Sequence, residues 1–316
     1  MKKNQKILIT GGAGFIASHL IDRLVDENKI IVFDNLHRNA FQYYPRKNHP
    51  NINFIQGDVL NYDLLEGCMK DVDICIHAAA IAGIYSVGVS TKKTMQVNLM
   101  GAYNSIEAAI KNNVKKFIDF STSEVYGPFV YRGKETGNTT LGPIHEKRWA
   151  YAVSKLASEF ITHSYGSDSD LNVASIRPFN VYGPRQIGEG AIQQIIQKAL
   201  RNENIIIYND GTQIRSWCYV EDFVDGLYRV IESDNVNGEV FNLGNPQTSI
   251  TNLNLAKTII RLTNSVSLIE FRPHPGPDVE MRIPDIEKAK MILGFNPQID
   301  LETGLKYTIQ WFRENK

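Results

Sequence analysis

Residues 6–20 read KILITGGAGFIASHL, and the fold of the chain follows from this stretch. Its first five residues form a short apolar run, and the apolar spacing after the glycines predicts a helix that continues to about residue 27. A second strand is predicted at residues 29–33, and it ends in Asp34. Strand, glycine turn, helix, strand and acid follow one another as in a dinucleotide-binding unit.

Each residue type in this unit suits one part of a dinucleotide. Gly11 and Gly14 let the backbone approach a pyrophosphate, and the start of the helix offers it free N–H groups. Ala17 stands in place of a third glycine, because close packing of helix on strand needs only a small residue. The carboxylate of Asp34 can accept hydrogen bonds from a ribose diol and would repel a 2′-phosphate. The unit therefore predicts NAD rather than NADP, although the basic residues 37–38 lie close by.

Strands and helices continue to alternate to the middle of the chain. This alternation predicts a parallel sheet whose ligands lie at the carboxyl ends of the strands. Asp58 follows one strand and is placed to reach an adenine, while Ala78, Ala79 and Ala80 follow another and leave room for a cofactor against the backbone. We interpret His77, at the end of that second strand, as structural. The further predicted strands are residues 52–55, 73–77, 116–120 and 172–178.

The composition restricts the classes of function. The 34 basic residues balance the 34 acidic residues among 316, so no electrostatic argument favours nucleic acid or an anionic membrane as a partner. No apolar run approaches a membrane-spanning length, and the start of the chain is predicted to be a strand rather than a signal peptide. Cys68, Cys75 and Cys218 lack metal-ligand spacing, which predicts no metal site and reduced thiols in a cytoplasmic protein.

A second motif lies at residues 149–155, which read WAYAVSK. On a helix, Tyr151 and Lys155 lie one turn apart on the same face. An ammonium beside a phenol favours the phenolate, so the pair is a candidate base for a sugar or alcohol hydroxyl. Any amphipathic helix can place these two residue types at this spacing, so the motif depends on the rest of the chain for its meaning.

Further motifs follow in a fixed order along nearly the whole chain. With these motifs the chain resembles the extended short-chain dehydrogenase/reductases, and among them the NAD-dependent epimerase/dehydratase group that acts on nucleotide sugars. The matching segments are TGGAGFIASH at 10–19, Asp34, GDV at 57–59, HAAA at 77–80, Asn98, STSEVYG at 121–127, YAVSK at 151–155, RPFNVYGPR at 177–185, YNDGTQIRSWCYVED at 208–222 and FNLGNP at 241–246.

The resemblance implies a Rossmann-type, doubly wound parallel sheet with a smaller, interleaved α/β lobe for the substrate. We expect residues 1–178, together with roughly 215–240, to form the NAD-binding domain, and residues 179–316 to form mainly the nucleotide-sugar-binding lobe. The resemblance also implies dimers that pair two helices of each subunit in a four-helix bundle. Those helices are expected at residues 94–112 and 149–164.

The resemblance assigns roles to the catalytic residues. Thr122 would hydrogen-bond the sugar 4-hydroxyl, Tyr151 would take its proton, and Lys155 would hold the nicotinamide ribose and depress the tyrosine pKa. A hydride would pass from sugar C4 to NAD and leave a 4-keto sugar. The same motifs imply that the cofactor is also lined by Phe15, Ile16, Asn35, Val59, Asn98 and Pro178.

Four residues of the second half are candidates for binding a nucleotide-diphosphate sugar, with UDP favoured. Asn180 matches a family residue at the diphosphate, and Arg185 ends the same motif. Tyr208 is placed to stack on a nucleobase, and Arg215 to pair with diphosphate oxygens, a geometry that suits a guanidinium. Core packing for Tyr208 and a surface ion pair for Arg215 are the alternative interpretations.

Ser123, Glu124 and Arg282 bear on which reaction follows C4 oxidation. A carboxylate at Glu124 suggests proton transfer at C5, and Ser123 is a poorer acid than the Asp of hexose 4,6-dehydratases. Residues 146–151 and the segment around Arg282 resemble the nucleotide-uronic acid decarboxylases, in which an arginine would meet a substrate carboxylate. Residues 77–89 instead resemble the dehydratases and epimerases.

We therefore predict a UDP-glucuronate-type decarboxylase, with a 4,6-dehydratase and then a 4-epimerase as alternatives. A non-catalytic NAD-sensing regulator of the same fold is a further alternative. The presence of Thr122, Tyr151 and Lys155 together argues against it.

Overall fold

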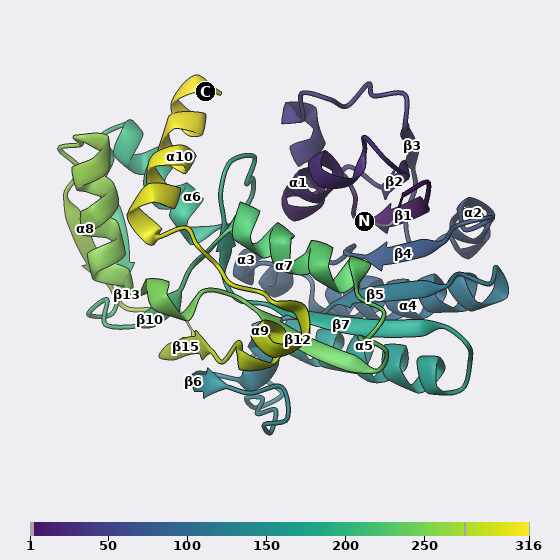
Figure 1. The fold of residues 1–316 in the computed structure, drawn as a ribbon. Coiled ribbons are helices and arrows are strands. Elements are labelled where there is room, and N and C mark those ends of the chain that lie inside the picture. The colour runs from purple at the N-terminus through teal and green to yellow at the C-terminus, as the bar shows by residue number, and fades with distance from the viewer. Residues whose placement is uncertain (1–2, 275, 316) are drawn as a thin grey trace.

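The computed structural model describes residues 3–274 and 276–315. They form a large parallel sheet between two layers of helices, and a smaller lobe lies to one side of it, at the left in Figure 1. The predicted α/β fold class with a Rossmann-type sheet is confirmed. The main sheet has the order β12-β7-β5-β4-β1-β2-β3, in which the strands are β1 (Lys6–Thr10), β2 (Lys29–Asp34), β3 (Ile52–Gln56), β4 (Ile74–His77), β5 (Lys116–Phe120), β7 (Asn172–Pro178) and β12 (Glu239–Leu243).

Alternate side chains of β1 are buried on opposite faces of the sheet. Ile7 and Ile9 are buried in one hydrophobic cluster, and Leu8, between them, is buried in another. Full burial of such a side chain contributes about 1.5–3 kcal/mol relative to exposure, so the strands are stabilised from both faces. The first cluster includes α1 (Phe15–Leu24) and α7 (Val220–Glu232), and the second is covered by α2 (Tyr62–Cys68), α4 (Thr91–Lys111) and α5 (Trp149–Ser167).

The smaller lobe is built from three separate parts of the chain. Its four-stranded sheet has the order β13-β10-β15-β6, and β6 (Phe129–Gly133) comes from the segment between β5 and α5. Between β10 and β13 the chain returns to the main sheet, where α7 packs on α1 and β12 pairs in parallel with β7. The other elements of this part of the chain are β8 (Val181–Tyr182), α6 (Ala191–Leu200), β9 (Ile205–Tyr208), β10 (Ile214–Ser216), β11 (Cys218–Tyr219), β13 (Ser249–Thr251), α8 (Asn252–Thr263), β14 (Ile269–Arg272), β15 (Met281–Pro284), α9 (Glu287–Leu293) and α10 (Leu301–Glu314).

Short elements join the strands at the edge where a ligand is expected. They are the 3-10 helices η1 (Ala40–Tyr43), η2 (Ser123–Tyr126) and η3 (Pro246–Thr248), and the short helix α3 (Ile84–Val89). The helix predicted at 94–112 begins earlier, at Thr91, because Ser90 caps it: the Ser90 hydroxyl accepts a hydrogen bond from the backbone N of Lys93 at 3.3 Å. In the described part of the chain, no helix combines the length and the apolar character that crossing a membrane requires.

The order of the strands determines where a ligand can lie. β1 is central, with β2 on one side and β4 on the other, so the chain winds outward in both directions from this point. In open parallel sheets, ligands bind at such a reversal, at the carboxyl ends of the strands. The glycine turn after β1, Asp34 at the end of β2 and the small residues after β4 all lie at that edge.

Candidate active site

The glycine turn between β1 and α1 leaves no room for side chains. Gly11 has a φ of +69°, and a Cβ built on it would lie 2.7 Å from the backbone N of Ala79, just beyond β4. Gly14 is the N-cap of α1, so the first turn of the helix, with residues 15–17, has N–H groups without partners inside the helix. The turn therefore has the close backbone approach and the free donors that a pyrophosphate requires.

Asp34 is held in place at the end of β2. Its Oδ2 accepts a hydrogen bond from the backbone N of Ala13 at 3.0 Å, and its Oδ1 accepts one from Leu36 N at 2.7 Å. Burial raises the pKa of Asp34, and these backbone hydrogen bonds lower it. The Asn35 amide donates to Asp58 Oδ2 at 3.4 Å, so these two predicted residues lie beside Asp34. The fixed carboxylate fits a ribose diol.

Asn98 forms hydrogen bonds with the backbone that follows β4. Its Oδ1 accepts a hydrogen bond from Ile81 N at 2.8 Å, and its Nδ2 donates to Ile81 O at 3.1 Å and to Ser154 Oγ at 3.0 Å. Residues 78–80 immediately precede this anchor and are half-buried. Val59 is buried in the core cluster that α2 and α4 cover. Asn98 thus holds the backbone that follows β4, and the Val59 side chain is packed in the core.

The catalytic residues predicted from the sequence meet at the ends of β5 and α5. Thr122 is the N-cap of η2, directly after β5, and its side chain lies next to that of Tyr151, whose pKa it lowers. Tyr151 and Lys155 lie one turn apart on α5. Pro178 ends β7, the neighbouring strand of β5 in the sheet.

Lys155 is a buried ammonium with unused hydrogen-bonding capacity. Its side chain is 1% exposed, and Nζ has no hydrogen-bond partner in the described part of the chain. Asp119 Oδ1 lies 3.9 Å away. Burial lowers the pKa of Lys155, whereas the charges of Asp119 and Glu159 raise it. Since an ammonium has three donors, this group is poised to hold hydroxyl groups of a ribose, which fits a dinucleotide in the crevice.

From the sequence we predicted that the pKa of Tyr151 is lowered. For the protein alone this direction was wrong. The structure raises the pKa of Tyr151 above its ordinary value, because the phenol is buried and the charge of Glu124 opposes its ionisation. Thr122 and the charge of Arg282 act in the opposite direction and do not outweigh burial.

Two buried arginines share one carboxylate next to this tyrosine. Arg282 Nη1 lies 3.5 Å from Glu124 Oε1, and Arg148 Nη2 lies 4.0 Å from the same oxygen. The side chains of Arg282 and Arg148 are 4% and 8% exposed, and the Nε of each has no hydrogen-bond partner in the described residues. Arg148 Nη1 donates to Pro277 O at 2.7 Å and Arg282 Nη2 donates to Gly127 O at 3.3 Å, but neither guanidinium makes a hydrogen bond to Glu124 of the usual charge-assisted length of about 2.7–2.9 Å. We call Arg148, Arg282 and Glu124 the arginine cluster.

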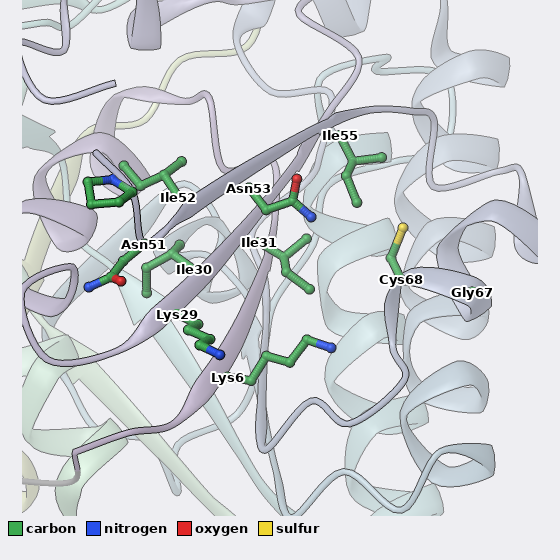
Figure 2. Close-up of a pocket in the computed structure, with 11 residues that line it drawn as sticks. Lys6, Lys29, Ile30, Ile31, Asn51, Ile52, Asn53, Ile55, Gly67 and Cys68 are labelled. Atoms are coloured by element: carbon green, nitrogen blue, oxygen red, sulfur yellow. The ribbon is translucent and has the colours of Figure 1, made fainter. Parts of the chain in front are cut away.

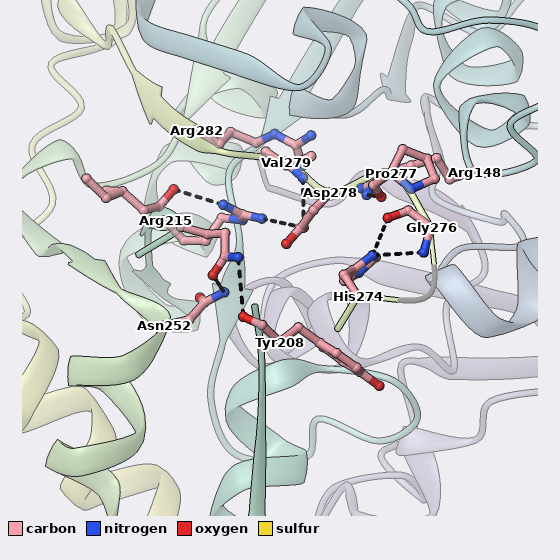
Figure 3. Close-up of polar contacts among 12 residues, drawn as sticks. Arg148, Tyr208, Arg215, Asn252, His274, Gly276, Pro277, Asp278, Val279 and Arg282 are labelled. Carbon is pink, nitrogen blue, oxygen red and sulfur yellow. Dashed lines mark hydrogen bonds and ion pairs between the residues drawn. The ribbon is translucent and has the colours of Figure 1, made fainter. Parts of the chain in front are cut away.

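A third arginine adjoins the cluster from the smaller lobe (Figure 3). Arg215 on β10 pairs in register with Arg282 on β15, and Asp278 Oδ1 lies 3.5 Å from its Nη2. Burial lowers the pKa of Arg215 to about 10, and the charge of Arg282 acts in the same direction. Tyr208, at the end of β9, is 42% exposed, and its ring packs edge-on against His274. Arg215 and Tyr208 both belong to the lobe where the substrate was expected, and Arg215 lies beside Arg282 (Figure 3).

The remaining two candidates for substrate binding, Asn180 and Arg185, lie in different surroundings. Asn180 lies at the joint between the main sheet and the smaller lobe, where its Nδ2 donates to Ser216 O at 3.2 Å. Arg185 is turned toward α1: Nη2 donates to Asp22 Oδ2 at 2.7 Å, and Nη1 donates to Ser18 O at 3.3 Å. The protein itself uses this guanidinium, and we therefore omit Arg185 from the substrate site proposed below.

A hollow of about 350 Å³ lies elsewhere, at the opposite edge of the sheet (Figure 2). It is bordered by Lys6 and Lys29, the first residues of β1 and β2, by the start of β3, and by Cys68 at the end of α2. None of the predicted site residues is among the described residues that line it. Because parallel sheets bind ligands at their carboxyl edge, this hollow is not the candidate site. No group of His, Cys, Asp or Glu in the described residues is arranged to hold a metal ion.

The sequence did not single out Arg148 or Asp119 as site residues. Asp119 is fully buried, and its Oδ1 accepts a hydrogen bond from Ser158 Oγ at 2.8 Å while facing Lys155. The signal was available: Asp119 is the one acid in the apolar strand KFIDF. Arg148 lies in the stretch 146–151 whose resemblance to the decarboxylases was noted above, and its distance from Glu124 places it in the site.

Comparisons with known proteins agree with this geometry. The profile of the NAD dependent epimerase/dehydratase family matches residues 7–244. The UDP-N-acetyl-alpha-D-glucosaminuronate decarboxylase of Bacillus cytotoxicus is 35% identical, over 99% of both chains. UDP-glucuronic acid decarboxylase 4 of Arabidopsis thaliana is 37% identical, over 99% of this chain and 70% of that protein.

A solved structure shows the same fold. The UDP-glucuronic acid 4-epimerase of Bacillus cereus, in complex with UDP-glucuronic acid and NAD, superposes with a TM-score of 0.91 at 28% identity, over 99% of this chain and 100% of that one. The match of the family profile confirms NAD as the predicted cofactor and confirms that the protein is an enzyme of this kind. The chain belongs to the NAD-dependent epimerase/dehydratase family, as an extended short-chain dehydrogenase/reductase.

Proposed function

We propose that this enzyme decarboxylates a UDP-linked uronic acid. The observation that carries the proposal is the arginine cluster: two buried guanidinium groups lie beside Tyr151, each donates to a backbone carbonyl, and the one carboxylate that they share is 3.5 and 4.0 Å away. Removing a charge from water is costly unless it gains a partner. A second carboxylate, at C6 of a uronic acid, would supply that partner. Two relatives at 35% and 37% identity are named as decarboxylases of such sugars.

The first step uses Thr122, Tyr151 and Lys155. NAD, when bound, supplies the acceptor for a hydride from sugar C4. Tyr151 takes the proton of the C4 hydroxyl, and Thr122, whose side chain lies next to that of Tyr151, holds the same sugar oxygen. Lys155 holds the ribose with its unpartnered Nζ. The sugar becomes a 4-ketone, and its C6 carboxylate is then β to that ketone.

The second step needs little more than positioning. Arg282 and Arg148 hold the carboxylate until the C5–C6 bond breaks, and carbon dioxide leaves. The electron pair of that bond enters the C4 ketone as an enolate, whose oxygen receives hydrogen bonds from Thr122 and Tyr151. A proton must then reach C5. We assign to Glu124 the relay of this proton from solvent to C5, because its side chain is 21% exposed and lies between the two guanidinium groups.

The nucleotide is proposed to lie across the smaller lobe. Arg215 and Asn180 would meet the diphosphate, and Tyr208, which is exposed at the end of β9, would stack on the base. Arg215 supports this role because it is 12% exposed and Asp278, at 3.5 Å, is a distant partner. UDP is favoured because the relatives and the solved structure are named for UDP-sugars.

We further propose a homodimer that pairs α4 and α5 of each subunit in a four-helix bundle. The two helices pack against each other, and large apolar side chains remain exposed on both. These side chains are Met100, Tyr103, Val153 and Phe160, with Phe160 exposed to 69%. The three cysteines are free and buried, which supports a reducing compartment, and we propose the cytoplasm.

The reaction is tested on a panel of nucleotide sugars. We expect the enzyme with NAD to remove carbon dioxide from UDP-glucuronate or UDP-N-acetylglucosaminuronate, because the arginine cluster needs a C6 carboxylate. Mass spectrometry of the products checks this, with UDP-glucose, dTDP-glucose and GDP-mannose as neutral controls. Loss of water from a neutral hexose with the uronates untouched would show a 4,6-dehydratase instead. A uronate product of unchanged mass would show a 4-epimerase.

The role of Tyr151 is tested by Tyr151→Phe. Because the phenol takes the C4 proton, we expect turnover to fall by about 10²-fold or more. NAD should remain bound after gel filtration, as measured by absorbance of the released nucleotide, because Lys155 and the glycine turn are unchanged. Tyr307→Phe, at a tyrosine exposed to 50% on α10, is the matched control and should turn over as the wild type does. Near-normal turnover in Tyr151→Phe contradicts the proposed mechanism.

The dimer is tested by light scattering during size exclusion. We expect the wild-type chain to elute at twice the mass of one chain. Phe160→Glu should shift the population to monomers, because it places a charge in the apolar contact. Met291→Glu changes a side chain that is 76% exposed on α9 and should leave the mass unchanged. A monomeric wild type at all concentrations rules the bundle out.

A further inference from the structure

Glu189, in the loop between β8 and α6, fastens two other loops to its own. Its Oε1 accepts a hydrogen bond from Arg38 Nη2 at 2.5 Å, and its Oε2 accepts one from the backbone N of Tyr85 at 2.7 Å. The backbone N of Ser86 donates to Oε1 at 3.2 Å, and the Ser86 hydroxyl also donates to this oxygen. Arg38 and Glu189 are 33% and 20% exposed, so the pair is only partly screened by water.

Two glycines make this close approach possible. Gly83 has a φ of +99°, and a Cβ there would lie 2.5 Å from Glu189 Oε2. Gly188 has a φ of +98°, and its Cβ would lie 3.1 Å from Arg38 Nε. Each position combines a left-handed backbone with contact to the ion pair, which only glycine accepts without strain. Backbone conformation and charge pairing thus agree in bringing the three loops together.

The contacts of Glu189 lie at the edge of the sheet where the dinucleotide is expected. Arg38 lies in the loop after β2, and Tyr85 and Ser86 lie in α3, after β4. β1 lies between β2 and β4, and the glycine turn with Gly11 follows β1. The link therefore joins the two loops that flank the glycine turn at the carboxyl edge of the sheet.

We propose that the ion pair between Arg38 and Glu189 closes over the bound dinucleotide and delays its release. We call the ion pair between Arg38 and Glu189 the strap. A cofactor bound at the glycine turn lies beneath the strap, and the strap has to open before the cofactor can leave. The strap also explains why a basic residue next to Asp34 does not signal NADP: Glu189 neutralises Arg38 and draws it toward α3.

The consequence for turnover rests on the proposed function. When the hydride taken from sugar C4 is to be returned to the product, the reduced cofactor has to stay on the enzyme until carbon dioxide has left. When the strap stays closed until carbon dioxide has left, the hydride can return to the sugar, and NAD is regenerated on the enzyme. Without the strap, the enzyme would release a 4-keto pentose together with NADH.

The strap is tested by the rate at which NADH leaves the protein without any sugar present. Stopped-flow fluorescence follows bound NADH while excess NAD displaces it. We expect Glu189→Gln and Arg38→Met to release NADH about tenfold faster than the wild type, because each removes a charge-assisted hydrogen bond. Arg38→Lys keeps the charge and should stay within about twofold of the wild type. Added salt should speed release from the wild type more than from Glu189→Gln.

The control is a second ion pair of the same loop. Arg46 donates to Asp26 Oδ2 at 3.2 Å, from the segment between β2 and β3 to the loop after α1, and this pair does not reach α3. Arg46→Met should release NADH at the wild-type rate. Equal rates in all variants, or an equal acceleration in Arg46→Met, overturn the strap.

The outcome for the strap is separate from the outcome for the reaction. Because no sugar is present, a wrong assignment of the substrate leaves the NADH release rates unaffected. Fast release from Glu189→Gln without carbon dioxide loss by the wild type upholds the strap and removes the proposed function. Unchanged NADH release rates together with carbon dioxide loss by the wild type overturn the strap and uphold the proposed function.

Discussion

The site depends on positive charge that is buried without a close carboxylate partner. Among the described residues, Lys155 Nζ has no hydrogen-bond partner and lies 3.9 Å from Asp119, while Arg282 and Arg148 donate to backbone carbonyls and share Glu124 at 3.5 and 4.0 Å. Such groups are costly to remove from water, and a folded chain retains them only where the surroundings or a ligand compensate. Lys155 meets the ribose of a cofactor in this account, and the two arginines meet the carboxylate of a substrate.

This arrangement requires the interleaved fold. Glu124 and Arg148 come from segments that precede and follow β6, whereas Arg282 and Arg215 lie on β15 and β10 of the smaller lobe. The sheet order β10-β15-β6 brings these segments together beside Tyr151, which the main sheet positions through α5. A lobe built from one continuous segment after β7 would lack β6. The return of α7 and β12 to the main sheet keeps the two parts of the site in contact.

The sequence predicted the local elements better than the long-range contacts. The strand, glycine turn and helix around Gly11, and the strand at residues 29–33 that ends in Asp34, follow from spacing and residue type, which are local properties. Arg185 was misplaced because its partners on α1 are more than a hundred residues away in the chain. The raised pKa of Tyr151 was missed for a similar reason, since burial depends on the packing of the whole molecule. The pairing of Arg38 with Glu189 is likewise invisible until the sheet order is known.

The most direct test of the account is the affinity of the arginine cluster for a C6 carboxylate, measured without turnover. Calorimetry on Tyr151→Phe loaded with NAD compares UDP-glucuronate with UDP-glucose. Hydrogen bonds to charged groups contribute about 1.5–3 kcal/mol, so the uronate should bind more than about tenfold tighter. Arg282→Gln in the same background should abolish the difference. Equal affinities for the two sugars in Tyr151→Phe would contradict the account.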